Sequence, residues 1–354
     1  LCLCYSLRYD SPILILCKEA ILRTASESIW CLSDGTEGMR FQSLAVAAAM
    51  NWDKSPNFYD IVITPNLLLR HIPWLGRWLP GLPLTKYSDN RLLSIDTIDD
   101  SPNIVLTCGR RMAGISIALK TRAIRQGVPM TTIHIQDPRL HPDLFDILIV
   151  PRHDPVRGEN VIVTKAALNK PVKPLIKKSA KFLPESWENA AAPRVAVLIG
   201  GDNRRYKISN IMVNKMVDQL VRFSEGTGAS LFLVPSRRCS PNVLQQLQNA
   251  LNGKTNSFLA NDGQPNPYPG VLEVVDAIIV TSDSVNMASE AASTGKPVLI
   301  ANWKSETGRI AKFHDMMKAE GHTAPIGTKI PKNPFIPLDE RAMVRDEINA
   351  RLTF

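Results

Sequence analysis

Short apolar runs alternate with amphipathic segments along the chain from about residue 28 to residue 325. Short apolar runs bounded by turn residues are typical of buried strands, and the segments between them have helical spacing. We expect strands at 29–33, 59–64, 103–108, 131–135, 146–150, 160–164, 194–199, 230–234, 256–259, 276–281 and 297–301. Helices are expected at 41–50, 113–126, 209–224, 241–251, 285–294 and 307–320. This alternation predicts βαβ units with mostly parallel sheets, and therefore a protein of the α/β class.

After residue 193 the alternation of strands and helices begins again with a new strand. This predicts two Rossmann-like, doubly wound domains facing each other across a cleft. We place the first domain at 28–170 and the second at 194–330. The segment between them, 171–193, is rich in Pro, Lys and Ala and is predicted to be a linker. The C-terminal segment, 331–354, has an amphipathic end that could return to the first domain. Residues 1–27 lack an initiator Met and are interrupted by charges, so we do not expect a signal peptide there.

Composition narrows the class of protein further. The 354 residues can form two full cores, and 44% hydrophobic with 21% charged residues is typical of a globular chain. The net charge of +9 is spread along the chain and favours anionic partners such as nucleotides or acidic headgroups, while no nucleic-acid-binding motif is present. Scattered cysteines and histidines without ligand spacing predict free thiols, a reducing cytoplasmic location and no metal site. No apolar run is long enough to predict a membrane span.

The most informative motif runs from Val280 to Ala291. It predicts a buried strand, a turn of small polar residues and the start of a helix, and such a turn offers free N–H groups and a helix dipole to an anion. Ser282, Asp283 and Ser284 are therefore candidates to hold a diphosphate. Glu290 lies about two turns along the same helix, where it could bind a ribose. A structural helix capped by Ser-Asp-Ser is the alternative, and both interpretations stay open.

Two further turns after predicted strands fit a diphosphate. The first begins Gly200-Gly201 and continues through Asn203 and Arg204, so that an open backbone is followed by guanidinium donors. Ser236 and Arg237 repeat this chemistry after the next strand. The alternatives are a surface turn with solvated arginines and a serine that caps the following helix.

The turn after the first predicted strand carries the candidate base. Asp34 and Glu37 lie between glycines that would let the backbone approach a ligand, and either carboxylate could accept a proton. Acidic residues also favour the first turn of a helix for purely electrostatic reasons, so this interpretation stays open as well. Neither a dinucleotide-binding Gly-x-Gly-x-x-Gly nor a Walker A loop is present, which argues against an oxidoreductase or an NAD-dependent epimerase.

The segment 71–84 points toward a membrane surface. It carries two Trp and four Leu beside His71 and Arg77, and amphipathic rings with basic neighbours suit a bilayer interface. Its prolines argue against one long amphipathic helix. Packing of these side chains between domains is the alternative.

Taken together, these segments resemble the mitochondrial fission "elongated mitochondria" family, whose bacterial members are described as glycosyltransferase-like. The matching residues lie in order over roughly 28–345 and are Asp34-Gly35…Gly38…Gln42, Cys108-Gly109-Arg110-Arg111, Gln136-Asp137-Pro138-Arg139, Pro151-Arg152-His153-Asp154, Gly200-Gly201-Asp202-Asn203, Asn266-Pro267-Tyr268 and Thr281-Ser282-Asp283-Ser284…Ser289-Glu290-Ala291…Thr294-Gly295-Lys296-Pro297. The resemblance implies a GT-B-like fold whose first domain binds an acceptor and whose second binds a nucleotide-sugar. For bacterial members the resemblance implies a role in making cell-envelope polysaccharide or lipopolysaccharide. For plant members it implies recruitment of a dynamin-related protein.

We therefore expect a glycosyltransferase that moves a sugar from a nucleotide-sugar to a cell-envelope lipid or glycan. Asp34 is the expected base, with Glu37 second because its position is not acidic in many relatives. No metal or other cofactor is expected, since there is no Asp-x-Asp triplet and basic residues can balance the leaving-group charge. A peripheral location on the inner face of the membrane would fit. The alternative is a non-catalytic, membrane-associated adaptor that recruits a dynamin-related partner.

Overall fold

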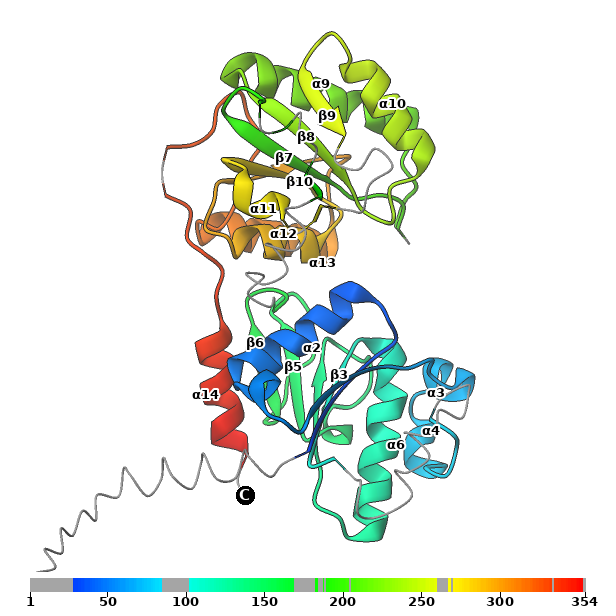
Figure 1. The fold of residues 1–354 in the computed structure, drawn as a ribbon. Coiled ribbons are helices and arrows are strands. Elements are labelled where there is room, and N and C mark those ends of the chain that lie inside the picture. Colours follow the sequence, from blue (N-terminus) through cyan, green and yellow to red (C-terminus); the bar gives the residue numbers. More distant parts are fainter. Residues whose placement is uncertain are drawn as a thin grey trace, which may run out of the picture. The chain divides into compact units, whose positions relative to one another are not determined.

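The computed structural model describes residues 28–84, 102–168, 182–183, 187, 189–203, 205–259, 267–268, 270–332 and 334–352. Their contacts divide the chain into two compact units. The first holds the described residues up to Val150, together with Val156–Val163 and those from Arg341 onward. The second holds Pro151–Pro155 and the described part of Thr164–Glu340. Each unit is built on its own sheet (Figure 1).

The first sheet has the strand order β2-β1-β3-β4-β5-β6. Its pairs β1–β2, β1–β3, β3–β4 and β4–β5 are parallel. The strands are β1 (Ile29–Ser33), β2 (Phe58–Val62), β3 (Ile104–Cys108), β4 (Thr131–Ile135), β5 (Ile147–Pro151) and β6 (Val161–Thr164). Because the chain leaves β1 toward β2 and then returns to the other side at β3, the strand order reverses between β1 and β3.

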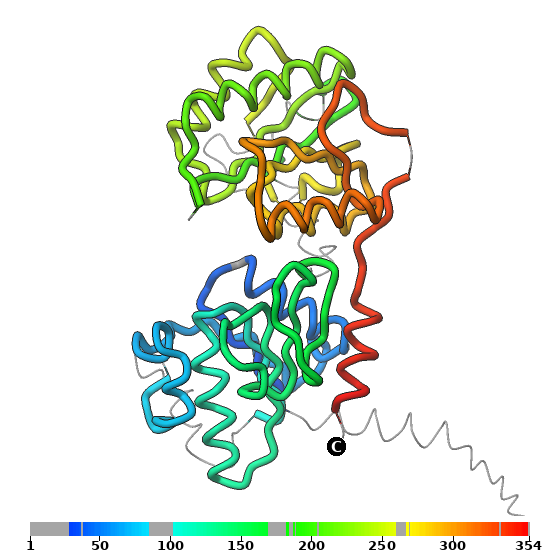
Figure 2. Tube along the Cα trace, turned by 180° about the vertical axis from the view of Figure 1, so that it is seen from behind, coloured from blue at the N-terminus to red at the C-terminus, as the bar shows by residue number. Residues whose placement is uncertain are grey.

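Helices α2 (Glu37–Ala49) and α6 (Arg110–Gln126) cover the first sheet, and the short helices α3 (Leu67–His71) and α4 (Leu75–Trp78) pack on α6. Two 3₁₀ turns lie at Trp52–Lys54 and Pro142–Leu144. The C-terminal helix α14 (Arg341–Arg351) packs on α2, although almost the whole chain separates them (Figures 1 and 2). Val344 and Ile348 form the buried face of α14.

The second sheet has the order β12-β11-β10-β7-β8-β9, and every neighbouring pair is parallel. Its strands are β7 (Arg194–Ile199), β8 (Ser230–Pro235), β9 (Asn256–Leu259), β10 (Ala277–Thr281), β11 (Val298–Ala301) and β12 (Ala324–Pro325). Its helices are α9 (Asn210–Thr227), α10 (Pro241–Leu251), α11 (Val271–Val274), α12 (Val285–Ala292) and α13 (Gly308–Ala319). Here the strand order reverses between β7 and β10.

Successive residues of β10 show how the second sheet buries both of its faces. Ile278 and Val280 belong to the core cluster that includes residues of α11, α12 and α13, whereas Ala277 and Ile279 belong to the cluster under α9 and α10. Side chains that alternate between two apolar layers require a continuous apolar run, which is the pattern that predicted these strands. The α/β class and the two doubly wound sheets are therefore confirmed.

Some expectations need adjustment. Helix α2 begins at Glu37 rather than near residue 41, because its polar first turn does not show the apolar spacing. The two-residue strand β12 and the helices α3 and α4 were not expected. Most of the expected linker at 171–193 lies outside the described residues. None of the described helices is long and apolar enough to cross a membrane.

Candidate functional site

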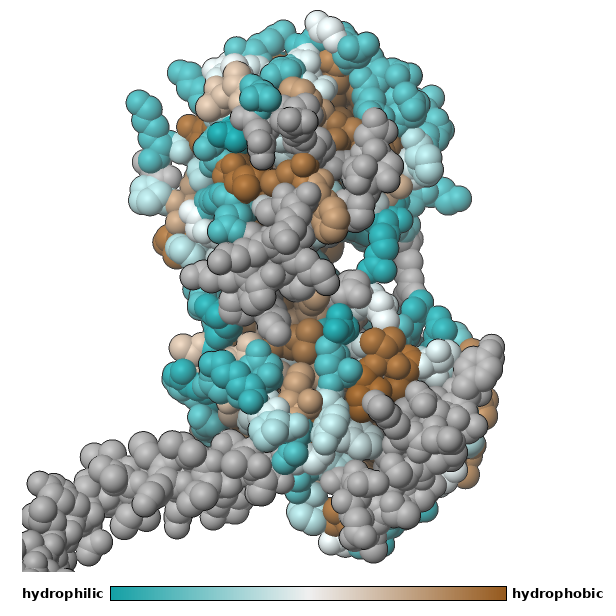
Figure 3. Space-filling model, in the orientation of Figure 1, coloured by the Kyte–Doolittle hydropathy of each residue, from teal (hydrophilic) through white to brown (hydrophobic). Residues whose placement is uncertain are grey.

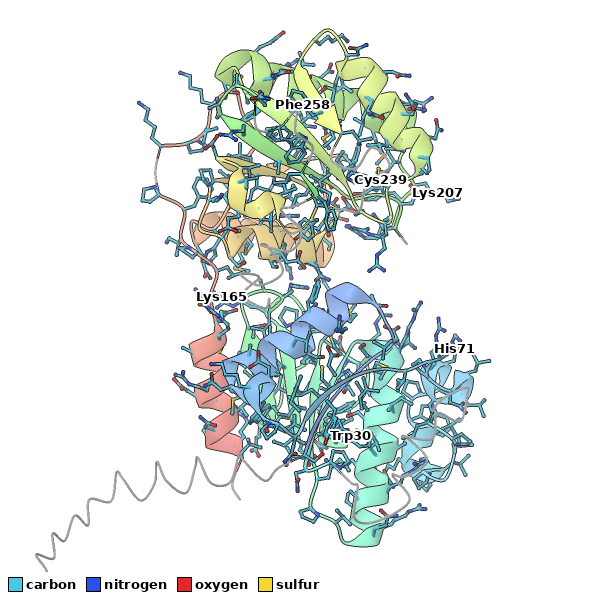
Figure 4. All side chains as sticks on the ribbon, viewed as in Figure 1. Trp30, His71, Lys165, Lys207, Cys239 and Phe258 are labelled. Carbon is cyan, nitrogen blue, oxygen red and sulfur yellow. The ribbon has the colours of Figure 1, made fainter. Side chains whose placement is uncertain are left out.

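The carboxyl ends of β7 and β10 meet where the strand order of the second sheet reverses. Parallel sheets of this kind bind ligands at such a reversal, because the loops there diverge and leave room beside the strand ends. Gly200 and Gly201 follow β7, while Ser282, Asp283 and Ser284 follow β10 and lead into α12. The structure thus brings two of the predicted turns together. Cys239 and Lys207 mark this end of the sheet in Figure 4.

Asp283 is the centre of this cluster, and its side chain is completely buried. One carboxylate oxygen accepts hydrogen bonds from the Thr281 hydroxyl at 2.7 Å and from the Trp303 ring nitrogen at 3.2 Å. The other accepts the backbone N–H of Gly201 at 3.2 Å and lies 2.8 Å from a guanidinium nitrogen of Arg238. A buried charge is tolerated when it is paired and hydrogen-bonded in this way. Asp283 therefore holds the turns after β7, β8 and β10 to one another.

The close packing of these turns explains why positions 200 and 201 are glycines. A Cβ atom on Gly200 would lie 2.1 Å from a carboxylate oxygen of Asp283, and one on Gly201 would lie 1.9 Å from the backbone oxygen of Arg238. Both distances are far shorter than any contact a real Cβ atom makes. The close approach that the sequence predicted for a ligand is thus made, in part, by the protein itself.

A second buried carboxylate, Glu306, lies between β11 and α13, with only 5% of its side chain exposed. It forms an ion pair with Arg205 and accepts hydrogen bonds from the Tyr206 hydroxyl at 2.8 Å and from the Ser282 hydroxyl at 3.0 Å. Burial and the neighbouring carboxylate raise the pKa of Tyr206, so its hydroxyl stays protonated as a donor. The Lys304 ammonium lies 4.2 Å from the centre of the Tyr206 ring, at cation–π distance.

Arg205 and Arg238 are each paired with a carboxylate and are also partly exposed to solvent. Their side chains are 36% and 40% exposed, although each is paired with a buried carboxylate. A guanidinium has five N–H donors in a fixed fork, so a carboxylate partner occupies only part of them. The arrangement fixes both arginines while leaving N–H donors toward solvent. It can therefore present guanidinium N–H donors to an anion near the start of α12.

Three other predicted residues of the second unit, Asn203, Ser236 and Ser284, form hydrogen bonds within their own turns. The Asn203 side-chain oxygen accepts the backbone N–H groups of Arg205 and Tyr206, at 2.8 and 3.2 Å, and so shapes the turn. The Ser236 hydroxyl accepts the backbone N–H of Arg238 at 3.3 Å. Arg237 is exposed, Ser284 caps α12 through the N–H of Met287, and Arg204 lies outside the described residues.

Glu290 lies on α12, as the sequence predicted, and its carboxylate accepts a hydrogen bond from the Tyr268 hydroxyl. Burial raises the pKa of Glu290 to about 6, and the hydrogen bond from Tyr268 opposes only part of that increase. The group is therefore ionised at neutral pH and can accept hydrogen bonds from ligand hydroxyls.

A cavity of about 270 Å³ adjoins this cluster on the side of β11 and β12. Glu306 and His314 line it, together with Lys215, Asn302, Lys318 and Thr323 among others. The Nε2 atom of His314 donates to the backbone oxygen of Ser282 at 2.8 Å. Burial lowers the pKa of His314, which keeps the ring neutral, and the carbonyl partner places the single ring proton on Nε2.

In the first unit, Asp34 lies at the corresponding reversal, between β1 and β3. Its carboxylate accepts the backbone N–H of Thr36 at 3.0 Å and lies 3.3 Å from a guanidinium nitrogen of Arg111, at the start of α6. Burial raises the pKa of Asp34, but the hydrogen bonds from Thr36 and Arg111 together outweigh it, so the pKa is below its ordinary value. Glu37 is the first residue of α2, and its side chain lies outside the described part.

Sequence reasoning did not single out Trp303 or Glu306, which follow β11. Arg238 ends the turn after β8 that the sequence predicted to contact phosphate, although only Ser236 and Arg237 were named there as site residues. Applying the same rule of polar residues at strand ends to β11 would have found Glu306. Among the described residues no group of His, Cys, Asp and Glu is arranged to hold a metal ion.

Two doubly wound units, each with its polar cluster at the strand-order reversal, define a GT-B-like protein. Solved structures of UDP-GlcNAc 2-epimerases share this fold. The UDP-GlcNAc 2-epimerase of Methanocaldococcus jannaschii is 12% identical, with a TM-score of 0.50 over 91% of this chain and 98% of that one. At this identity the similarity shows the fold alone.

The chain belongs to the mitochondrial fission ELM1 family, whose model matches residues 37–352. It is 28% identical to the mitochondrial fission protein ELM1 of Arabidopsis thaliana, over 72% of this chain and 70% of that protein. It is 26% identical to an uncharacterised protein of Rickettsia prowazekii, over 77% of this chain and 82% of that protein. The family resemblance seen in the sequence is thereby confirmed.

Proposed function

We propose that this protein is a glycosyltransferase whose second unit binds a nucleotide-sugar donor. The observation that carries this proposal is the pair Arg205 and Arg238, each held by a buried carboxylate and each partly exposed beside the start of α12. Charge-assisted N–H donors next to a helix N-terminus suit a diphosphate. A protein of the same fold, the epimerase of M. jannaschii, is named for a nucleotide-sugar substrate, which agrees with this assignment.

In this proposal the two arginines and the hydroxyl of Ser284 contact the diphosphate, and Glu290 accepts hydrogen bonds from the ribose. Ser282 acts indirectly, because it is buried and its hydroxyl donates to Glu306. Asp283 acts indirectly, because its carboxylate is already shared among Thr281, Trp303, Gly201 and Arg238. The Gly200-Gly201 turn and the Asn203 side chain set the position of the arginines. Two guanidinium groups can balance the charge of the leaving diphosphate, so we propose that no metal is required.

Asp34 is the proposed base. It would take the proton of the acceptor hydroxyl as that oxygen bonds to the anomeric carbon of the sugar and the bond from that carbon to the diphosphate oxygen breaks. The nucleoside diphosphate then leaves with the electron pair. We propose a cell-envelope lipid or glycan as the acceptor, bound by the first unit.

One observation favours a second candidate, a non-catalytic adaptor. The Asp283 carboxylate fills the space beside Gly200, so a negative charge lies where a diphosphate would approach the turn. A plant relative is named a mitochondrial fission protein, and the adaptor assignment agrees with that name.

Calorimetry and thermal shift with UDP-, GDP-, ADP-, CMP- and dTDP-sugars test the proposal. One donor should stabilise the wild-type protein, and Arg205→Ala or Arg238→Ala should weaken its binding roughly 10–100-fold, the value of a charge-assisted hydrogen bond. Arg222→Ala, at an exposed arginine of α9, is the matched control and should bind like the wild type. If no donor stabilises the folded protein, the adaptor is the better assignment.

A further inference from the structure

The helices α3 and α4 expose an unusual number of large apolar side chains. Trp78 is 69% exposed, Leu67 57% and Trp74 51%, and Leu68, Ile72 and Leu79 are exposed as well. We name these six residues, together with Arg70, His71 and Arg77, the α3–α4 face. Apolar (brown) side chains lie along the outer edge of the first unit where these helices lie, and His71 is labelled at the end of α3 (Figures 3 and 4).

The packing of the two helices explains why these side chains point outward. α3 and α4 approach α6 through backbone contacts: a Cβ atom on Gly114 would lie 2.2 Å from the Leu69 oxygen, and one on Gly76 would lie 2.6 Å from the Gly114 oxygen. Leu69 is fully buried in the core cluster on the inner side of the two helices, and Leu75 is partly buried against the same cluster. Because the backbones touch, little space remains on the inner side for the tryptophans.

The segment after α4 is fixed too, so the α3–α4 face is a rigid platform. The Arg122 guanidinium on α6 donates to the backbone oxygen of Leu82 at 2.6 Å and also to that of Pro80. A preformed apolar surface loses little conformational entropy on binding. Contiguous exposed apolar residues of this kind mark an interaction site rather than chance exposure.

The charge of the segment indicates which partner the face suits. From Pro65 to Leu84 the sequence contains Arg70, His71 and Arg77 and no acidic residue. Trp with basic neighbours suits the headgroup layer of a bilayer that contains anionic lipid. A second copy of the chain is a poorer partner, because a two-fold interface between two such faces would bring basic residues together with no acidic residue of the segment to pair them.

We propose that the α3–α4 face docks onto anionic phospholipid membranes. Trp74, Trp78 and Leu79 enter the interfacial layer, while Arg70 and Arg77 contact headgroup phosphates. The proposal does not depend on the donor site of the second unit. It would place the first unit at the surface from which a lipid acceptor could be drawn.

Co-sedimentation of the full chain with vesicles tests this proposal. We expect binding to phosphatidylcholine vesicles that contain phosphatidylglycerol and much weaker binding to phosphatidylcholine alone. Trp74→Ala/Trp78→Ala should weaken binding at least about tenfold, as expected for losing buried apolar side chains. Arg70→Gln and Arg77→Gln should each weaken it about fivefold. Ile211→Ala, at an exposed apolar residue of the second unit, and Arg222→Ala, at an exposed arginine of α9, should bind like the wild type.

Tryptophan fluorescence gives a second readout that does not depend on sedimentation. The chain has six Trp, and Trp30, Trp52, Trp187 and Trp303 are buried. Quenching by brominated lipid should therefore come from Trp74 and Trp78, and should disappear in the double variant. Equal binding to neutral and anionic vesicles, unchanged binding of the double variant, or no vesicle binding with a dimer that the double variant dissociates would each overturn the proposal.

Discussion

The two buried carboxylates of the second unit each hold an arginine that remains partly exposed. Asp283 orients Arg238, and Glu306 orients Arg205, while other donors satisfy the remaining oxygen lone pairs. Losing one member of such a network leaves a buried charge without compensation, which costs more than one ordinary contact. The network as a whole therefore fixes the geometry of the candidate donor site.

Glu290 should make the stability of the second unit depend on pH. Its pKa of about 6 exceeds the ordinary 4.5, so between these values the folded protein binds more protons than the unfolded chain. The free energy of unfolding therefore falls as the pH rises through this window, by roughly 2 kcal/mol in total. Glu290→Gln removes the charge and should be about 2 kcal/mol more stable than the wild type near pH 8, with a smaller difference near pH 5.

Urea unfolding over a series of pH values checks this. Glu225→Gln, at an exposed residue of α9, should show no such pH-dependent gain. A Glu290→Gln variant that is less stable than the wild type near pH 8 would contradict the prediction. The same variant should lose donor affinity if the ribose assignment is right.

The ionisation of Asp34 should set the acid limb of the pH profile of kcat/KM for the transferase reaction. Its pKa lies below the ordinary 3.8, so the proposed base stays ionised in mildly acidic solution. Arg111→Gln removes one of the two groups that lower this pKa, and the acid limb of kcat/KM should then move to higher pH. Asp34→Asn should reduce kcat by about 10²–10⁴-fold while the fold is retained.

Arg125→Gln, at an exposed position of the same helix α6, is the control and should leave the pH profile unchanged. An acid limb that does not move in Arg111→Gln, or full activity in Asp34→Asn, would contradict the assignment of Asp34 as the base.

At the scale of elements, the turns after β7, β8 and β10 form one packed unit rather than three independent loops. The backbone of the β7 turn passes so close to Asp283 and Arg238 that neither glycine has room for a side chain. The helix α12 begins from this turn, so its position depends on the same contacts.

Gly200→Ala should therefore destabilise the second unit by about 1–3 kcal/mol, the usual cost of overpacking, and should abolish donor binding. Gly327→Ala is the matched control, because a Cβ there meets no atom within 4 Å. Thermal unfolding with and without donor distinguishes the two variants. Unchanged stability of Gly200→Ala would show that the turn can move aside.

At the scale of the whole molecule, the C-terminal helix α14 belongs to the first unit, although it follows the second in the sequence. Val344 and Ile348 are completely buried. Ile348→Ala should destabilise the first unit by about 2–5 kcal/mol, whereas Asn349→Ala at an exposed neighbour should not. Hydrogen exchange resolved along the chain should show faster exchange in α2 and α14 and unchanged protection in β7 and β10. Faster exchange in both units would contradict this.

Much of the fold could be predicted because buried parallel strands leave a local signal. Each expected strand is present within a few residues, and the turns after β1, β7 and β10 were singled out as sites. The short helices α3 and α4 were missed because the prolines around them interrupt the apolar spacing. Glu306 follows β11, where the rule of polar residues at strand ends indicates a candidate, but its hydrogen bond with Ser282 joins distant turns and leaves no signal in the sequence.

The α/β class, the two sheets and the polar turns at their strand ends follow from the sequence, because apolar periodicity is a local property of the chain. Which turns meet depends on the fold, since the strand order places Arg238 beside Asp283 and Glu306 beside Ser282. The fold also explains why the glycines are required, because the atoms that lie against Gly200 and Gly201 come from distant turns. Likewise, the outward direction of Trp74 and Trp78 follows from backbone contacts with α6, which residue spacing does not encode.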